Sequence, residues 1–181
     1  MKTATTTGKE GVSDWDVLVV GAGPAGAIAA RGCAERGARV LLVDREAFPR
    51  WKVCGACLGP GGRHALGRAR LGSLPERLGA THLVNLMLTT GARSARIRLN
   101  GNVAVSRSAL DAALVEEASA AGATVRTGVR AEADAGDAEG IRVVRLRERD
   151  GKRTELARAT VAIDATGLAG GFDRERPDVH S

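Results

Sequence analysis

The chain has 181 residues, of which 44% are hydrophobic, 27% are charged and only 2% are aromatic. This balance excludes a disordered chain and fits a folded domain whose core is built from Ala, Val and Leu. The formal charge of +6 comes from scattered arginines with interleaved acids, and the chain has almost no aromatic surface for stacking bases, so we expect no nucleic-acid partner.

Cysteine content and hydropathy bear on the compartment. Three cysteines, an odd number, argue against a disulfide framework and for a reducing compartment. The most apolar stretch, residues 17–30, has only 14 residues and contains three glycines and a proline, which is too short to span a bilayer. The sequence therefore predicts a cytoplasmic protein without a membrane span, and it carries no signal for an oligomeric state.

The first predicted elements form a βαβ unit. Residues 1–13 are polar and Thr-rich, and we expect them to be a disordered leader. A short apolar strand follows at Trp15–Val20, then a helix that opens at Pro24 and runs to Arg36, then a second strand at Arg39–Val43. Strand, helix and strand with tight joints are typical of a nucleotide-binding α/β fold.

The rest of the chain predicts a loop-rich stretch and then a mixture of strands with one long helix. A short helix is expected near Arg63–Arg70, and residues 171–181 are expected to be an unstructured tail. The sequence predicts α/β class: a Rossmann-like domain over residues 14–170 with a mostly parallel sheet and a small antiparallel β-meander. The later elements expected are strands Thr81–Thr90 and Arg93–Leu99, helix Arg107–Ala121, and strands Ala123–Arg126, Val129–Ala133, Gly140–Arg149, Lys152–Ala157 and Thr160–Ala165, with a two-residue turn at Asp150-Gly151.

A glycine-rich motif lies between the first strand and the first helix, which is the context in which such a motif is informative. Gly21 allows the chain to turn tightly out of the strand, and Gly26 lets the helix lie close to it. Gly23 has no Cβ, so a pyrophosphate can approach the backbone. The N–H groups of the first helical turn and the positive end of the helix dipole then face the anion.

Asp44 ends the second strand, at the spacing where an acid accepts hydrogen bonds from the adenosine ribose hydroxyls. A carboxylate at this place disfavours a 2′-phosphate, and therefore NADP, in this site. The motif alone leaves the ligand open between NAD and FAD.

Four segments of the chain resemble one family. Asp16–Arg45 is similar to the N-terminus of FAD-dependent oxidoreductases of the p-hydroxybenzoate hydroxylase-like fold, and Phe48–Leu58 (FPRWKVCGACL) resembles the geranylgeranyl reductase-like branch with its flavin-dependent monooxygenase and halogenase relatives. Arg107 with the helix after it, and Val161–Gly167 (VAIDATG), resemble two further segments of that group. The resemblance implies FAD as the cofactor, NAD(P)H as one possible external reductant, and a flavin-dependent reductase or monooxygenase acting on a hydrophobic small molecule.

The resemblance also implies roles for single residues. The FAD pyrophosphate would be held by Gly21, Gly23, Pro24, Ala25 and Gly26. Asp44 would bind the ribose with Arg45 beside the adenosine, and Ala131 would contact adenine through its backbone. Cys54 and Gly55 would lie near the flavin ring, and Arg107 would lie along the pyrophosphate or ribityl chain. Thr166 and Gly167 would belong to the third flavin-contacting segment.

Two departures from the family pattern matter. Thr166 stands where many hydroxylases of this fold have an Asp, a pattern closer to the halogenase-like branch, which leaves NAD(P)H handling open. Family members also continue with a Gly-Asp segment and the strands of a substrate domain. We therefore expect an N-terminal portion whose C-terminal substrate domain is missing, with enzymatic activity depending on that half. The alternative is a non-catalytic nucleotide-binding fragment of a truncated gene.

Cys54 and Cys57 form a C-x-x-C pair that permits several interpretations. They fit a loop that lines the flavin or serves structure, or else the redox pair of a flavin disulfide reductase. A zinc site would need a second ligand pair, and only Cys33 remains, so we expect no metal.

The other chemistry-bearing residues give weaker signals. The three histidines show no ligand spacing, and no catalytic constellation can be named. We expect Trp51 to pack against the protein, the alternative being that it shields one face of a flavin. We expect Arg50 and Lys52 to be solvated charges beside the cysteine loop, the alternative being that they meet an anionic substrate or phosphate.

Overall fold

A computed structural model of the chain describes residues 12–52, 54, 56–134 and 140–167. The predicted tail, Gly55, and residues 1–11 of the predicted leader lie outside the described residues. The chain divides into two compact units, one made of Met1–Phe48 with Leu114–Ser181 and the other of Pro49–Ala113. Each unit is described by itself.

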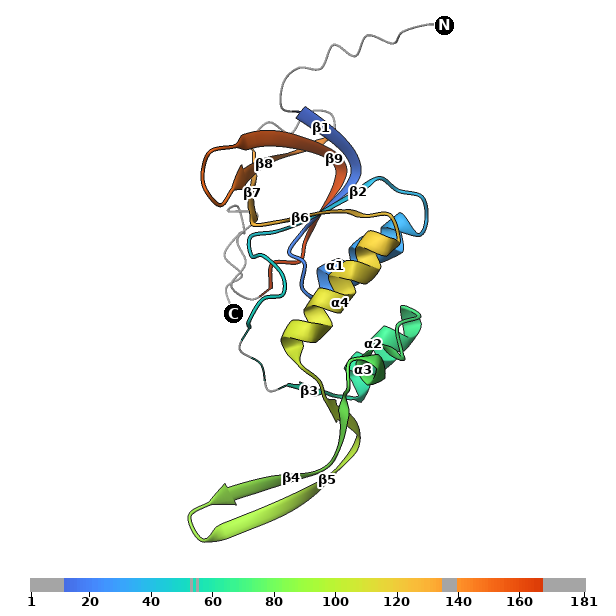
Figure 1. The fold of residues 1–181 in the computed structure, drawn as a ribbon, viewed down its shortest axis with the longest axis vertical. Coiled ribbons are helices and arrows are strands. Elements are labelled where there is room, and N and C mark those ends of the chain that lie inside the picture. The colour runs from blue at the N-terminus through green and yellow to red at the C-terminus, as the bar shows by residue number, and fades with distance from the viewer. Residues whose placement is uncertain (1–11, 53, 55, 135–139, 168–181) are drawn as a thin grey trace, which may run out of the picture. The chain divides into compact units, whose positions relative to one another are not determined.

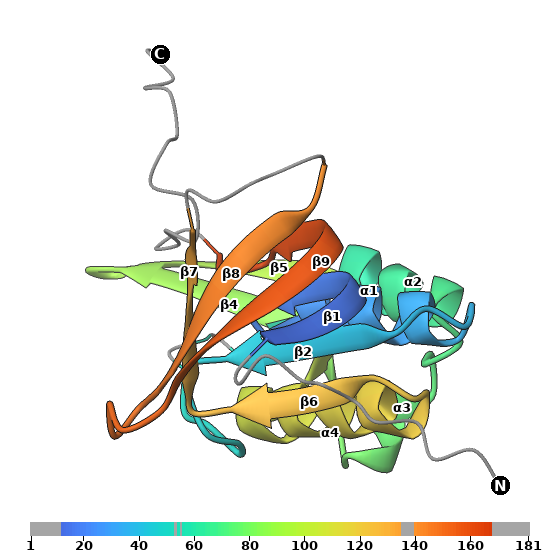
Figure 2. The same ribbon diagram turned by 90° about the horizontal axis from the view of Figure 1, so that it is seen from above.

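The first unit is built on a six-stranded sheet in the order β6-β2-β1-β9-β8-β7 (Figures 1 and 2). The first four strands of this order run parallel, and β8 and β7 add an antiparallel meander. The predicted α/β class with a largely parallel sheet and a small antiparallel addition is thus confirmed. The elements are β1 (Val12–Val20), α1 (Pro24–Ala34), β2 (Val40–Asp44), β6 (Thr124–Thr127), β7 (Val129–Ala133), β8 (Arg142–Glu148) and β9 (Thr154–Asp164).

The core of this unit consists of aliphatic side chains from the sheet. All five residues of β2 are buried, and Leu18, Leu41, Val43, Val144 and Leu146 belong to one cluster. Each such side chain contributes roughly 1.5–3 kcal/mol when it is fully removed from water. Among the described residues, every buried hydrophobic side chain is Ala, Val or Leu, as the composition predicts.

Helix α1 packs its small residues against β1 and β2. Gly26, Ala27 and Ala30 are its buried positions, so the helix axis can approach the sheet closely. The helix ends at Ala34, two residues before the predicted end, and the chain turns back where the Gly37 N–H donates to the Ala34 carbonyl at 2.9 Å.

Strand β9 differs from the prediction, which placed two strands at Lys152–Ala157 and Thr160–Ala165. It is a single strand because two neighbours support it: its first half pairs antiparallel with β8, and β1 pairs with it from Leu156 to Asp164. The same pairing extends β1 to Val12, which lies opposite Leu156. Val12 and Ser13 therefore belong to a strand rather than to the leader. A partner strand, and not the local sequence, decides these ends.

The turn between β8 and β9 is also longer than predicted. The Glu148 N–H donates to the Arg153 carbonyl at 3.0 Å, which leaves four residues, 149–152, in the loop. The Asp150 carboxylate accepts the Lys152 N–H at 2.9 Å, and Gly151 takes a φ of +71°. The side-chain bond of Asp150 closes a wider turn than the Asp-Gly pair indicates.

The second unit combines a three-stranded antiparallel sheet, in the order β3-β5-β4, with short helices. The predicted helix near Arg63 begins earlier, at Pro60, where proline suits the first helical turn. Strand β5 continues past Leu99 because its end pairs with the start of β4 on one side and with β3 on the other. Strand β3 is too short to leave a sequence pattern. The elements are β3 (Cys57–Leu58), α2 (Pro60–Arg68), α3 (Leu74–Arg77), β4 (Thr81–Thr90), β5 (Arg93–Ala104) and the start of α4 (Arg107–Ala120).

Helix α4 buries the face that its periodicity predicts. Leu110, Leu114 and Ala118 are 5%, 1% and 0% exposed, and Asp111 is buried among these positions at 1%. Among the described residues, no helix is long and apolar enough to cross a membrane.

Candidate nucleotide-binding site

Three parallel strands bring their carboxyl ends together in the first unit. The Gly21 N–H after β1 donates to the Val43 carbonyl of β2 at 2.8 Å, and the Ala165 N–H after β9 donates to the Val20 carbonyl at 2.8 Å. Within the sheet, β2 is the neighbour of β1 on one side and β9 is its neighbour on the other, so the strand order reverses at β1. In open α/β sheets, ligands bind outside the carboxyl ends at such a reversal of strand order.

Two glycines of the motif are required by the chain's own packing. Gly21 has a φ of +101°, and a Cβ there would lie 2.5 Å from the Ala165 carbonyl oxygen. A Cβ on Gly26 would collide with the carbonyl oxygen of Gly21. These glycines close the strand–helix joint whether or not a ligand is bound.

Gly23 is different, because its φ of −72° and ψ of −179° are extended backbone that any residue adopts. The first helical bond of α1 is donated by Ala27 to the Gly23 carbonyl at 2.9 Å. Within the described residues, the N–H groups of Gly23, Ala25 and Gly26 make no hydrogen bond, and Pro24 has no N–H to donate. Three unengaged donors at the positive end of a helix fit a pyrophosphate.

Asp44 is 5% exposed and fixes this loop from the end of β2. Its Oδ2 accepts the Ala22 N–H at 2.7 Å, and its Oδ1 accepts the Glu46 N–H at 2.9 Å. Sequence reasoning assigned Asp44 to the ribose and missed this second role in the protein itself. The ribose contact stays a prediction.

The predicted third flavin segment follows β9 at the same edge of the sheet. The Thr166 hydroxyl donates to Asp164 Oδ1 at 2.5 Å, and the Thr166 N–H donates to the same oxygen at 2.9 Å. Gly167 is exposed with a φ of +84°. The Thr166 side chain thus closes a turn beside the glycine-rich loop, whose Gly21 lies against Ala165.

Arg45 is one of four arginines that line a shallow depression of about 410 Å³. Ala131 packs against the core, and its neighbours Arg130 and Glu132 border the depression, so the backbone of β7 runs along it. The adenine contact of Ala131 and the adenosine contact of Arg45 stay predictions. The full lining is Arg45, Glu46, Gly128, Arg130, Glu132, Arg147, Glu148 and Arg149.

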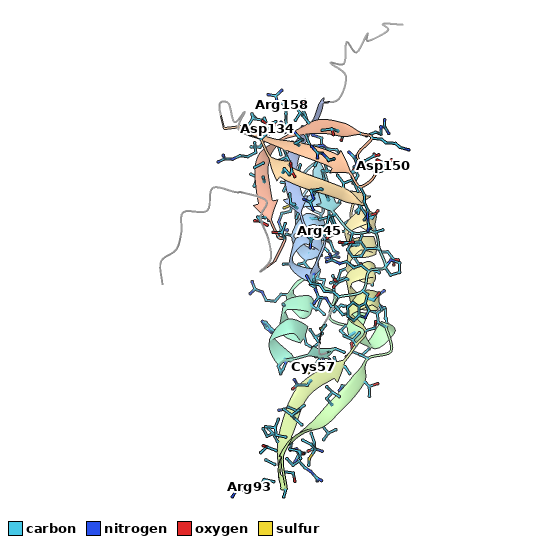
Figure 3. All side chains as sticks on the ribbon, turned by 90° about the vertical axis from the view of Figure 1, so that its left-hand side faces the viewer. Arg45, Cys57, Arg93, Asp134, Asp150 and Arg158 are labelled. Carbon is cyan, nitrogen blue, oxygen red and sulfur yellow. The ribbon has the colours of Figure 1, made fainter. Side chains whose placement is uncertain are left out.

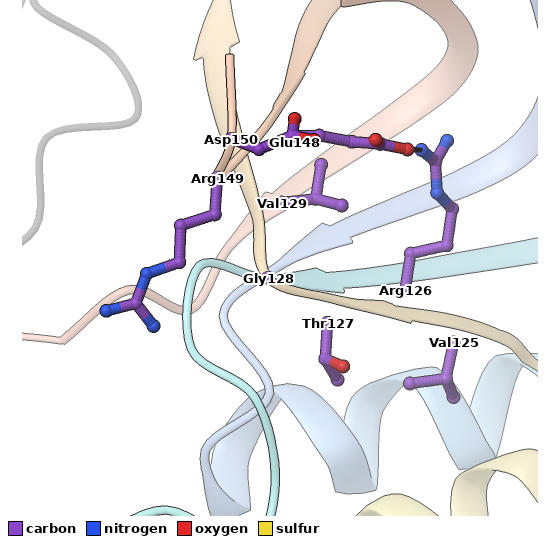
Figure 4. A pocket seen from close by; sticks show the side chains of 8 residues that line it. All are labelled: Val125, Arg126, Thr127, Gly128, Val129, Glu148, Arg149 and Asp150. Atoms are coloured by element: carbon purple, nitrogen blue, oxygen red, sulfur yellow. Dashed lines mark ion pairs between the residues drawn. The ribbon is translucent and has the colours of Figure 1, made fainter. Parts of the chain in front are cut away.

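A neighbouring depression of about 520 Å³ lies at the junction of β6 and β7 (Figure 4). Glu148 points toward Arg126, with an ion pair of 3.6 Å, whereas Arg149 extends in the other direction and pairs with Glu46 at 3.7 Å. The lining of these two depressions does not include the glycine-rich loop. The loop is therefore identified as a candidate site by its backbone donors and not by a cavity.

The second unit holds the predicted residues Cys54 and Arg107. Arg107 Nε donates to Asp111 Oδ1 at 2.5 Å, and this bond, followed by a weaker one to Cys54, raises the pKa of Arg107 above its usual value. Cys54 and Cys57 are free thiols and exposed, and the Cys57 sulfur accepts a hydrogen bond from Asn102 Nδ2 at 3.6 Å. Figure 3 shows Cys57 at the base of the β4–β5 hairpin.

Two expectations for this loop are wrong. Trp51 is 84% exposed and does not pack against the protein. The Arg50 side chain is only 13% exposed, because its Nη2 donates to the buried Asp111 Oδ2 at 3.5 Å. A buried carboxylate is costly without cationic partners, which explains why this arginine leaves solvent.

The comparison with protein families decides the identity of the fold and the cofactor. The family model for an FAD binding domain matches residues 14–170. The chain belongs to this FAD-binding family. FAD is therefore the cofactor, and the chain is an FAD-binding domain of the flavin-dependent monooxygenase and reductase family.

Known relatives of this FAD-binding domain include reductases and a halogenase. It is 31% identical over 170 residues to digeranylgeranylglycerophospholipid reductase of Methanosphaerula palustris, which covers 90% of this chain and 41% of that protein. It is 56% identical to menaquinone reductase of Mycobacterium tuberculosis over 45 residues, and this match covers 25% of this chain and 11% of that protein. The myxobacterial chondrochloren halogenase superposes with a TM-score of 0.75 at 26% identity, over 88% of this chain and 38% of its own.

The FAD-binding domain thus spans about two fifths of the two proteins that it matches over most of its length. The family identified from the motifs at Asp16–Arg45 and Phe48–Leu58 is confirmed.

Proposed function

We propose that this chain binds the ADP half of FAD at the glycine-rich loop and serves a flavin-dependent oxidoreductase that acts on a hydrophobic small molecule. The observation that carries the proposal is that the N–H groups of Gly23, Ala25 and Gly26, at the start of α1, make no hydrogen bond within the part of the chain that the structure describes. In this proposal Asp44 accepts the Ala22 N–H of the loop and also hydrogen-bonds the ribose hydroxyls, and Arg45 lies beside the adenosine. The Thr166–Gly167 turn and Ala131 provide the other backbone contacts.

The protein's contribution would be binding and orientation, since FAD supplies the redox chemistry when it is bound. Cys54 and Arg107 are proposed as the residues of the second unit that meet the cofactor. The hydrophobic character of the substrate is supported by relatives that are named for a lipid and for a quinone. NAD(P)H is proposed as the external reductant, and the cytoplasm as the location, which the three free thiols support.

The test is FAD titration of the purified chain, followed by flavin fluorescence, with the variant Gly23→Val. A side chain at position 23 would stand where the phosphates must lie, so the dissociation constant should rise by about 100-fold or more. Gly61→Val is the matched control. Gly61 lies in the first turn of α2, which like α1 begins with a proline, and a Cβ there meets nothing within 4 Å.

Both variants should fold, because neither glycine has a positive φ. Unchanged FAD affinity in a folded Gly23→Val protein would contradict the proposed site. Release of the bound ligand by heat, and its identification as NAD rather than FAD, would contradict the proposed function.

A further inference from the structure

Two arginines of the second unit converge on one buried carboxylate. Asp111 is 1% exposed, and its two oxygens accept hydrogen bonds from Arg107 Nε at 2.5 Å and from Arg50 Nη2 at 3.5 Å. The two arginines come from different places in the sequence, the loop after Pro49 and the first residue of α4. The cluster therefore ties that loop to the start of the helix.

Packing alone does not account for this carboxylate. Asp111 occupies the buried face of α4 beside Leu110 and Leu114, where an apolar residue would be the simplest choice. Removing a carboxylate from water is costly, and replacing a buried ion pair by apolar residues is often neutral or stabilising. An acid at such a position is explained if it serves to orient its two arginine partners.

The geometry determines which part of Arg107 is held. A guanidinium group has five N–H donors in a rigid planar fork. The Nε donor, the guanidinium nitrogen nearest the main chain, is bound to Asp111, and Cys54 lies close enough to Arg107 to add to the rise in its pKa. Fixing one edge of a planar group fixes the direction of its remaining donors.

We infer that Asp111 is a positioning residue, which holds Arg107 by Nε so that the rest of the guanidinium group stays directed at Cys54 and at an anionic group of the cofactor. The part that concerns Cys54 rests on the bond between Arg107 and Asp111 and on the nearness of Cys54 to Arg107, all within this unit. The part that concerns the cofactor rests on the proposed function. Bidentate recognition of phosphate by arginine requires such a fixed plane.

The test reads the position of Arg107 without FAD. In a background of Cys33→Ser and Cys57→Ser, Cys54 is the remaining thiol, and its alkylation by iodoacetamide is followed at neutral pH. Asp111→Asn should change the rate at least about threefold when Arg107 is present, and leave it unchanged when Arg107 is replaced by Met. Equal effects in both backgrounds, or none in either, would overturn the inference, since a merely structural role does not depend on Arg107.

A second experiment measures the dissociation constant of FAD for the same double-mutant cycle, which combines Asp111→Asn and Arg107→Met, in the intact chain. Asp111→Asn should weaken binding about tenfold with Arg107 present and have no further effect on Arg107→Met. Asp16→Asn, an exposed arginine-paired acid of the other unit, and Arg63→Met, an exposed arginine paired with Glu76, are the matched controls and should change neither readout.

The two proposals can fail separately. If the unmodified chain does not bind FAD, the proposed function fails, and the alkylation cycle still decides on Asp111. If Asp111→Asn does not fold, Asp111→Glu keeps the charge and takes its place, and it should leave the Cys54 rate closer to the unmodified value than removal of Arg107 does. A Glu variant that behaves like Arg107→Met would count against the inference.

Discussion

Gly21 and Gly26 are required by the fold, whereas Gly23 is proposed to serve FAD binding, and the difference should appear in the stability of single variants. Gly21→Ala and Gly26→Ala place a Cβ against the backbone oxygens of Ala165 and Gly21. We expect each to lower the free energy of unfolding by more than about 3 kcal/mol, because the strand–helix joint has no room to relax. Gly23→Val should leave the unfolding midpoint in urea almost unchanged.

The measurement is chemical denaturation of the chain without FAD, followed by circular dichroism. Similar midpoints for all three variants would show that the joint is looser than the structure indicates. The sequence motif already assigns Gly21 to the turn and Gly26 to the contact between helix and strand. The structure adds the backbone oxygens that a Cβ at each position would meet.

Asp44 supports a second prediction for single residues. In Asp44→Asn, one oxygen of the carboxylate becomes an NH₂ group that faces a backbone donor, either the Ala22 or the Glu46 N–H. Because the site is buried, we expect a loss of about 2 kcal/mol in the free energy of unfolding, and FAD binding weakened at least tenfold. Asp164, at the end of the neighbouring β9, is exposed, and a single oxygen, Oδ1, accepts both bonds from Thr166. In Asp164→Asn the amide oxygen can keep that place, so the variant should cost less than half as much stability.

Thermal and urea unfolding of the two variants give the comparison. Equal losses would mean that the burial of Asp44 adds nothing to its role in the loop. The sequence could predict that an acid belongs at the end of β2. It could not predict the bond to Ala22, because that contact joins residues 22 positions apart.

At the level of elements, the sequence predicts what lies inside a strand or helix better than where it ends. The strands Thr81–Thr90 and Val129–Ala133 are predicted with their true bounds, and α4 with one residue of difference. The errors gather where a distant partner sets the bounds, as at β9, which pairs with β1 and β8. Two-residue β3 and the buried Asp111 also depend on tertiary contacts that have no period in the sequence.

The joint between β1 and β2 supports a prediction with a pH dependence. Asp16 Oδ1 accepts from Arg39 Nη2 at 3.0 Å, and Oδ2 accepts the Arg39 N–H at 2.7 Å. The side-chain bond from Arg39, and then the backbone bond, lower the pKa of Asp16 below its usual value. A depressed pKa adds stability above the unfolded value of about 3.9 and loses it as the pH falls through the folded value.

Asp16→Asn should therefore lower the Tm at pH 7 by about 1 °C, because the pair is exposed and screened. The difference from the unmodified chain should shrink as the pH falls below the usual Asp range, where both carry a neutral group at this position. Arg39→Gln should give the same pattern. A difference that persists unchanged in acid would show that the charge is not its cause.

At the scale of the whole molecule, the exposed apolar surface is concentrated on one hairpin. Five of the seven large apolar side chains that are exposed in the described residues lie on β4 and β5, and Arg93 marks the tip of this hairpin (Figure 3). Strand β4 is an edge strand of ten residues without a charged side chain. Uncharged edges with an apolar face favour association. The exposed side chains are Val84, Leu86, Met87, Leu88 and Ile97.

The two faces of this hairpin differ, which makes association testable. Leu86 lies opposite Ile97 on one face, and Thr89 lies opposite Ser94 on the other. If the apolar face drives association, Leu86→Lys should raise the concentration at which the chain self-associates by about tenfold, as seen in sedimentation velocity. Thr89→Lys adds the same charge to the same strand on the opposite face and should change it little. If both variants dissociate the chain equally, the free backbone edge of β4, and not its apolar face, is the surface that associates, because a charge on either face disturbs pairing at the edge.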